Sequence, residues 1–177
     1  MYAAESEISE MTIIEDTRNK AYKAKNGRTV DKHRNIHDYC VRNGIEIIRT
    51  KMLVGDYTLP TDQRICIDTK MSMVEVSQNI YQDHKRFTNE LQLAKECGIK
   101  LIVLIEDETV RNWSDLLKWT NPQPNAGPLT PNGERCYKVM KTMENTYGCR
   151  FEFCRHDETG KRIIELLKGE QDGKDAI

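Results

Sequence analysis

The chain has 177 residues, of which 38% are hydrophobic and 31% charged, and its formal net charge is -1. This length suits one domain with a single core. The near-neutral charge excludes a strongly cationic protein that wraps nucleic acid, and no apolar run is long enough to span a membrane.

The two ends of the chain are polar. Residues 1–11 carry three glutamates, without the basic start and apolar block of a secretory signal, so we expect a flexible acidic leader there. A single domain should cover residues 12–168, followed by a polar tail at residues 169–177. Within the domain we expect a core at 12–106, a long loop at 120–135 and a C-terminal addition at 136–168.

The first third of the domain predicts short strands around one helix. A β-branched run opens it, and a polar, basic loop follows from Asn19 to Val30. Asp31 can cap a helix that reaches Asn43, with Gly44 as its left-handed stop. The predicted strands, of which the last three should form a meander, are Thr12–Asp16, Ile45–Arg49, Leu53–Leu59 and Arg64–Asp68.

The remainder of the domain predicts more helix. Lys100–Ile105 is a continuous apolar run, typical of a strand buried on both faces. Arg150–Cys154 should be an edge strand. The predicted helices are Val74–Cys97, Trp113–Trp119, Tyr137–Tyr147 and Gly160–Leu167, with Gly98 and Gly148 as stops. The order indicates an α/β domain with a central mixed sheet flanked by helices and a C-terminal α/β addition.

The six cysteines are spread out without tight pairs, which favours reduced thiols packed as small hydrophobes. A zinc site formed by Cys149, Cys154 and His156, with Cys136 as a fourth ligand, is the alternative. Its C-x4-C-x-H spacing lacks the C-x2-C knuckle that makes zinc signatures specific.

Positive charge gathers in residues 17–51, which hold ten Lys or Arg against three acids, a local net charge of +7. Such a segment can steer a phosphate backbone, because phosphate contacts give affinity without sequence information. A solvated loop without a ligand is the alternative. The candidate DNA-binding residues in this segment are Arg18, Lys20, Lys23, Lys25 and Arg28.

Three acids and a lysine stand at or within predicted strands, where they can converge on one edge of the sheet. Asp68 and Lys70 share a face of their strand because side chains alternate. Mg²⁺ or Mn²⁺ prefers a few carboxylates plus waters, so Asp16, Asp56 and Asp68 are candidate ligands. Lys70 would orient water or counter developing charge. Taken singly, each acid could equally be a turn residue, a strand end or a helix cap.

Four ordered blocks, Ile13–Arg18, Val54–Tyr57, Ile67–Lys70 and Asn79–Phe87, resemble the nuclease domain of the XPF family of structure-specific endonucleases. The resemblance covers about residues 12–106 and is closest to compact bacterial and phage members, which residues 147–154 and 160–167 also resemble. It implies a restriction-endonuclease-like PD-(D/E)xK core.

The resemblance also implies roles for individual residues. Asp16, Asp56 and Asp68 would bind metal, with Asp56, Asp68 and Lys70 forming the catalytic group. Arg18 and Arg86 would face phosphate. The family's Glu-Arg-Lys-x-x-x-Asp signature is altered here: Asp68 and Thr69 replace its first two residues, and Val74 its last. Glu75, one residue further on, could replace the missing acid as a ligand.

The leading hypothesis is therefore a Mg²⁺- or Mn²⁺-dependent DNA endonuclease that acts on branched or flap DNA in phage or bacterial recombination or repair, in the cytoplasm. The chain has no room for the helix-hairpin-helix module of eukaryotic members, so targeting would come from its loops, a homodimer or a partner protein. Two alternatives remain: a Holliday-junction resolvase or restriction-type nuclease, and an inactive nuclease fold that binds DNA or protein.

Overall fold

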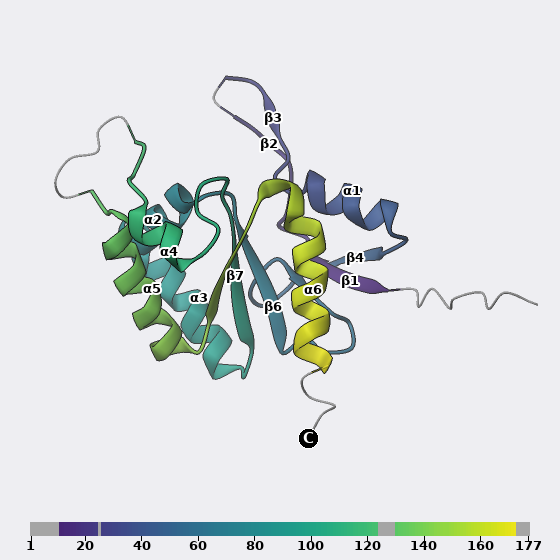
Figure 1. Cartoon of the computed structure of the whole chain (residues 1–177). Helices are drawn as coiled ribbons and strands as arrows, with labels where there is room; N and C mark the ends of the chain where they lie inside the picture. Colours follow the sequence, from purple (N-terminus) through teal and green to yellow (C-terminus); the bar gives the residue numbers. More distant parts are fainter. Residues whose placement is uncertain (1–10, 25, 124–129, 173–177) are drawn as a thin grey trace, which may run out of the picture.

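The computed structural model describes residues 11–24, 26–123 and 130–172. A mixed sheet lies between two helical layers, and a small hairpin stands beyond one end of the sheet (Figure 1). The strands are β1 (Thr12–Asp16), β2 (Tyr22–Lys23), β3 (Thr29–Val30), β4 (Glu46–Thr50), β5 (Tyr57–Thr58), β6 (Ile65–Lys70), β7 (Lys100–Glu106) and β8 (Arg150–Cys154). The helices are α1 (Arg34–Arg42), α2 (Met73–Tyr81), α3 (His84–Glu96), α4 (Trp113–Lys118), α5 (Gly133–Tyr147) and α6 (Thr159–Asp172), with a 3-10 turn at His156–Glu158.

The sheet confirms the predicted mixed α/β class. Its six strands lie in the order β4-β1-β5-β6-β7-β8. β1 and β4 are parallel, as are β6, β7 and β8, whereas β5 runs antiparallel to both of its neighbours. The C-terminal ends of β6, β7 and β8 therefore meet at one edge, where Lys70 is level with Ile105.

The predicted meander is wrong. β4 pairs with β1 rather than with the next strand in the chain, so of the three strands of the predicted meander only β5 and β6 pair with each other. Of the predicted strand Leu53–Leu59 only Tyr57 and Thr58 are in a strand. Residues 53–56 form a bend that leads into β5 beside β6. The predicted basic loop holds the two-stranded hairpin of β2 and β3.

Two helix predictions also change. The single helix Val74–Cys97 is two helices, because the chain breaks at Gln82 and Asp83. α1 begins at Arg34, three residues after Asp31, whose carboxylate instead accepts a hydrogen bond from the His33 N–H at 3.0 Å. Gly44, Gly98 and Gly148 have the positive φ angles expected of helix stops.

Alternating side chains of the central strands form a core on each side of the sheet. Cys66, Val103 and Ile105 pack with α2, α3 and α5, and we call this side the α3 core. Ile67, Ile102 and Leu104 pack with α1 and α6 on the opposite side, which we call the α6 core. The strand predicted to be buried on both faces, β7, contributes to both cores as expected. The two central strands therefore join the two helical layers.

The cysteines follow this division. Cys149 packs in the α3 core and Cys154 in the α6 core, which separates two of the three residues of the zinc alternative. Burial raises the pKa of each of these thiols to about 12, so both stay protonated. No three His, Cys, Asp or Glu side chains in the described ranges are grouped to hold a metal. The zinc alternative is therefore wrong.

No helix within the described part of the chain is long and apolar enough to cross a bilayer. Residues 1–10 of the predicted leader, 124–129 of the predicted loop and 173–177 of the predicted tail lie outside the described residues. α6 continues to Asp172, beyond Leu167, where the apolar pattern predicts its end.

Candidate active site

Gly55 brings Asp56 against strand β6. Its φ angle is +72°, and a Cβ atom there would lie 3.0 Å from the carbonyl oxygen of Ile67 and 3.1 Å from the Cys66 Cβ. Only glycine combines this backbone conformation with such a close approach. The next residue, Asp56, then donates its main-chain N–H to the Ile67 carbonyl at 2.7 Å. The Gly-Asp pair thus fixes Asp56 beside the strand that carries Asp68 and Lys70.

Asp68 and Lys70 form a buried ion pair near the C-terminal end of β6. The Lys70 Nζ lies 2.6 Å from Oδ2 of Asp68, and both side chains are less than 10% exposed. Burial raises the pKa of Asp68, the Lys70 ammonium offsets part of this effect, and Asp56 adds to the rise. Burial lowers the pKa of Lys70, but the Asp68 carboxylate outweighs it, so the pKa of Lys70 is raised and the ammonium stays charged.

The Lys70 ammonium lies over the aromatic ring of Phe87. The Nζ lies 5.6 Å from the centroid of this ring, which is 2% exposed, so α3 offers the cation an aromatic face. Glu75, in the first turn of α2, also contributes to the raised pKa of Lys70, after Asp68. One Glu75 oxygen accepts the Met71 N–H at 2.8 Å. Glu75 therefore acts on Lys70 through its charge, while one oxygen of the Glu75 carboxylate is held by a main-chain N–H.

Thr69 holds Asp56 in place. Its main-chain N–H and its hydroxyl both donate to Oδ2 of Asp56, at 2.9 Å and 2.6 Å. The other oxygen, Oδ1, makes no hydrogen bond with the described residues. The threonine at this altered position of the signature thus leaves one Asp56 oxygen available to a ligand.

Asp16 is fully engaged by its neighbours. Its carboxylate accepts the Nε–H, NH2 and main-chain N–H of Arg18 at 2.8, 2.8 and 2.6 Å, and the N–H of Met52 at 2.8 Å. Burial acts to raise the pKa of Asp16, but these donors outweigh it and hold the pKa below its usual value. Both oxygens are thus occupied, and Asp16 joins β1 to the segment after β4.

A divalent cation fits this site only in part. Oδ1 of Asp56 and Oδ1 of Asp68 accept no hydrogen bond from the described residues, whereas Oδ2 of Asp68 is held by the Lys70 ammonium. One or two carboxylates with waters suffice for Mg²⁺. Asp56 and Asp68 would therefore hold the metal, whereas Asp16 would have to release Arg18 and Met52 to join them.

Glu90 is a site residue that the sequence patterns did not single out. From α3 its Oε1 accepts the N–H of Gly55 at 3.2 Å, and its charge contributes, after Asp16, to the raised pKa of Arg18. It resembles an ordinary polar residue on an amphipathic helix, so its spacing gave no signal. In the folded chain the Glu90 side chain contacts the main chain of the Gly55-Asp56 turn.

A buried polar network behind the site was also missed. Glu15 is 0% exposed and binds the Tyr57 hydroxyl at 3.0 Å, the His37 Nε2 at 2.8 Å and the Arg49 Nε at 3.0 Å. Burial acts to raise the pKa of Glu15, but His37 and the other partners hold it below its usual value. Glu15 precedes Asp16 in β1, and Tyr57, the first residue of β5, follows Asp56, so this network joins the two strands next to the candidate site.

The predicted DNA-binding residues lie on the surface. Arg18 remains 59% exposed despite its bonds to Asp16. The remaining side chains are exposed on the segment that leads to β2, on the β2–β3 hairpin and on α3: Lys20, Lys23, Arg28 and Arg86. Lys25 lies outside the described residues. Arg86 precedes Phe87 in the first turn of α3 and its side chain is exposed.

No protein-family model and no curated protein sequence matches the chain. Solved structures do: XPF from Aeropyrum pernix matches with a TM-score of 0.60 at 15% identity, over 90% of this chain and 65% of that one. The fold is XPF-like. A structure of XPF from Aeropyrum pernix in complex with DNA matches with a TM-score of 0.61 at 14% identity, over 93% of this chain and 66% of that one.

The chain spans just under two thirds of the XPF chains that it matches. At this level of identity the likeness extends to the path of the backbone. Within the XPF-like fold, the structure brings Asp56, Asp68 and Lys70 together beside Glu75, and Glu90 behind Gly55.

Proposed function

We propose that the chain is a DNA endonuclease that uses Mg²⁺ or Mn²⁺ to hydrolyse phosphodiester bonds, with a PD-(D/E)xK type of site. The observation that carries the proposal is the buried Asp68–Lys70 ion pair beside Asp56 at one edge of an XPF-like fold. Buried charges are costly and rare unless they serve a purpose, so this pair is a candidate for chemistry.

Each residue has a distinct task in this proposal. Asp56 and Asp68 would hold the metal, which would neutralise phosphate charge and activate a water. Lys70, cationic because of Asp68, would stabilise the negative charge that develops on the phosphate oxygens. Thr69 keeps Asp56 in position, and Arg18 and Arg86 would contact backbone phosphates.

The substrate in this proposal is branched or flap DNA, in phage or bacterial repair or recombination. The DNA complex of the structurally similar XPF supports DNA as the partner. In this proposal a homodimer or a separate targeting protein would add contacts to the DNA.

The test is a cleavage assay with labelled flap, splayed-arm, four-way and plain duplex DNA, in Mg²⁺, Mn²⁺ or EDTA. We expect metal-dependent cutting of the branched substrates and a loss of roughly 100-fold or more in rate for Asp68→Asn and for Lys70→Ala. Lys138→Ala removes an exposed lysine from α5 and should cut at the unaltered rate. Cleavage that survives both active-site substitutions would refute the site assignment, and symmetrical nicking of the four-way junction would instead indicate a resolvase.

A second candidate, an inactive nuclease fold that binds DNA or protein, is favoured by two observations. Asp16 is saturated by Arg18 and Met52, and no three acidic, His or Cys side chains in the described ranges form a ready metal cluster. DNA binding without cleavage of any of the four substrates in either metal would support this candidate.

A further inference from the structure

The β2–β3 hairpin, the start of α1 and the turn between β8 and α6 line an open cleft of about 860 Å³, which we call the hairpin cleft. In Figure 1 the hairpin stands beyond the sheet, above the first turns of α1 and α6. The residues that line the hairpin cleft include Arg28, Lys32, Arg34, Asn35, Met71 and His156.

The hairpin cleft adjoins the candidate active site. Met71, which lines it, directly follows Lys70 at the end of β6. Lys32 lies within electrostatic reach of the site as well: burial raises the pKa of Asp68 and Lys70 lowers it, and Lys32 adds a smaller lowering effect. Met71 and Lys32 thus place one wall of the hairpin cleft near the candidate active site.

Two cations in the hairpin cleft are available to a ligand. Arg28 is exposed and Lys32 half-buried, and neither side chain makes a hydrogen bond or ion pair with the described residues. The acids of the lining are engaged: Asp31 accepts the His33 N–H, and Asp38 lies 3.8 Å from Arg34. The cleft thus offers unpaired positive charge, which suits an anionic ligand.

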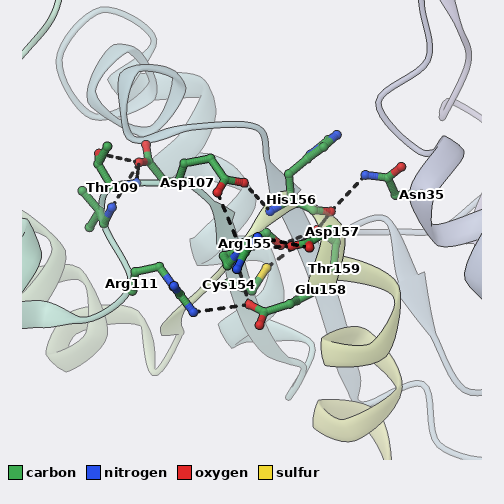
Figure 2. A network of polar contacts seen from close by, with 12 residues as sticks. Asn35, Asp107, Thr109, Arg111, Cys154, Arg155, His156, Asp157, Glu158 and Thr159 are labelled. Atoms are coloured by element: carbon green, nitrogen blue, oxygen red, sulfur yellow. Dashed lines mark hydrogen bonds and ion pairs between the residues drawn. The ribbon is translucent and has the colours of Figure 1, made fainter.

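The floor of the hairpin cleft is held by polar contacts between distant segments. Figure 2 shows Asn35 reaching from α1 to the main-chain carbonyl of His156, at 3.0 Å. The neighbouring Arg155 contacts Glu108 and Asp157, at 3.6 and 3.2 Å. These bonds join α1, the segment after β7 and the β8–α6 turn, so they fix the floor of the cleft.

The size and lining of the hairpin cleft suit a single strand. Pockets of roughly 300–1,000 Å³ hold one small ligand, so this volume has room for a few linked nucleotides of one strand. No Phe, Tyr or Trp is among the described residues that line it, so base stacking contributes less than phosphate contacts. Binding should then be independent of sequence and sensitive to salt.

We propose that the hairpin cleft holds a single-stranded arm of the DNA substrate beside the scissile phosphate, with Arg28 and Lys32 contacting its backbone phosphates. This inference rests on the proposed function, because it takes DNA as the substrate. It adds a binding site for one particular part of that DNA, which would favour splayed-arm and flap substrates over plain duplex.

The test measures binding without cleavage. A fluorescent single-stranded oligothymidylate and a blunt duplex of equal length are titrated with the chain in EDTA, and anisotropy is followed at several salt concentrations. For Arg28→Ala and for Lys32→Ala we expect roughly fivefold weaker binding of the single strand. The slope of log affinity against log salt should fall by about 0.7 for each substitution. Duplex binding should change less.

Lys138→Ala on α5 is the matched control, and thermal unfolding midpoints verify that each variant is folded. The inference is overturned if Arg28→Ala and Lys32→Ala bind like Lys138→Ala, if the unaltered chain fails to bind the single strand in EDTA, or if duplex binding falls as much as single-strand binding. Its failure is distinct from that of the proposed function, because the latter is read from metal-dependent product and this inference from affinity in EDTA.

Discussion

Three aspartates with the same predicted role occupy three different environments. Asp16 is saturated by Arg18 and Met52, Asp56 is half engaged by Thr69, and Asp68 faces only the Lys70 ammonium. A carboxylate whose oxygens already accept charged and main-chain donors must lose those bonds to bind a metal. The candidate metal site is therefore centred on Asp56 and Asp68, with Asp16 as a residue that positions β1.

His33 makes the stability of the fold sensitive to acid. Its Nδ1 contacts the Tyr57 hydroxyl at 2.6 Å, and its Nε2 is buried without a hydrogen-bond partner among the described residues. Burial, reinforced by Lys32, lowers the pKa of His33 to about 4. Between pH 6.5 and about 4 the unfolded chain therefore binds a proton that the native chain does not, so stability falls as the pH falls through this range.

We expect His33 to account for about 3 kcal/mol of unfolding free energy lost between pH 7 and pH 4. His33→Asn keeps a donor for the Tyr57 hydroxyl without the titrating ring, so it should flatten this part of the pH profile. Urea unfolding at several pH values measures the effect, with the exposed His84→Asn as control. An unchanged slope in His33→Asn would contradict the assignment.

His37 acts in the opposite direction. The hydrogen bond that His37 donates to the Glu15 carboxylate raises the pKa of His37 despite partial burial. Its contribution to stability is therefore fully present below pH 6.5 and is lost as the pH rises through the higher folded value. His33 at the N-cap of α1 and His37 within α1 therefore change the stability of the fold in opposite directions as the pH varies.

At the scale of elements, close backbone contacts decide where helices and strands can meet. Gly133, the first residue of α5, packs on the end of α4: a Cβ there would lie 1.7 Å from the Leu116 carbonyl oxygen. Its N–H also donates to the Trp119 carbonyl at 2.9 Å. No side chain fits this contact without moving the backbone of one helix.

We expect Gly133→Ala to destabilise the chain by about 3 kcal/mol, because α4 and α5 must separate. Gly169→Ala, also within a helix, meets no atom within 4 Å and should stabilise by roughly 0.5–1 kcal/mol. Thermal or urea unfolding of both variants makes the comparison. Equal effects of the two substitutions would show that the α4–α5 contact adapts freely.

At the scale of the whole molecule, the central strands couple the two cores. Ile163 on α6 is 0% exposed in the α6 core, whereas Trp119 belongs to the α3 core on the opposite side. β6 and β7 supply side chains to both. If one helical layer unfolds, β6 and β7 lose the packing that holds them in place, and the other helical layer packs on the same two strands. We therefore expect one cooperative unfolding transition.

Ile163→Ala should therefore lower the unfolding free energy by about 2–5 kcal/mol, and a probe in either core should give the same value. Tryptophan fluorescence, which reports on the α3 core, and far-ultraviolet circular dichroism should shift to the same urea midpoint. Lys168→Ala, exposed on α6, should change stability by less than about 0.5 kcal/mol. A fluorescence midpoint that stays in place while circular dichroism shifts would mean that the two layers unfold separately.

Local patterns predicted most elements of the fold. The apolar run of β7 indicated a strand buried on both faces, and Gly98 and Gly148 marked helix ends with positive φ angles. The break between α2 and α3 was missed because the apolar positions from Val76 to Ala94 keep a helical period across it. The pairing of β4 with β1 was missed because strand order depends on contacts between segments far apart in sequence.

The sequence by itself determined the α/β class, the XPF-like order of elements and the residue types of the candidate site, because these depend on local periodicity and short motifs. Only the tertiary structure decided how each charge is partnered. It bound Asp16 to Arg18, paired Asp68 with Lys70, brought Glu90 behind Gly55 and placed the hairpin cleft beside Met71. The pKa of a side chain, its burial and the number of its hydrogen-bond partners depend on neighbours that the chain brings together only when it folds.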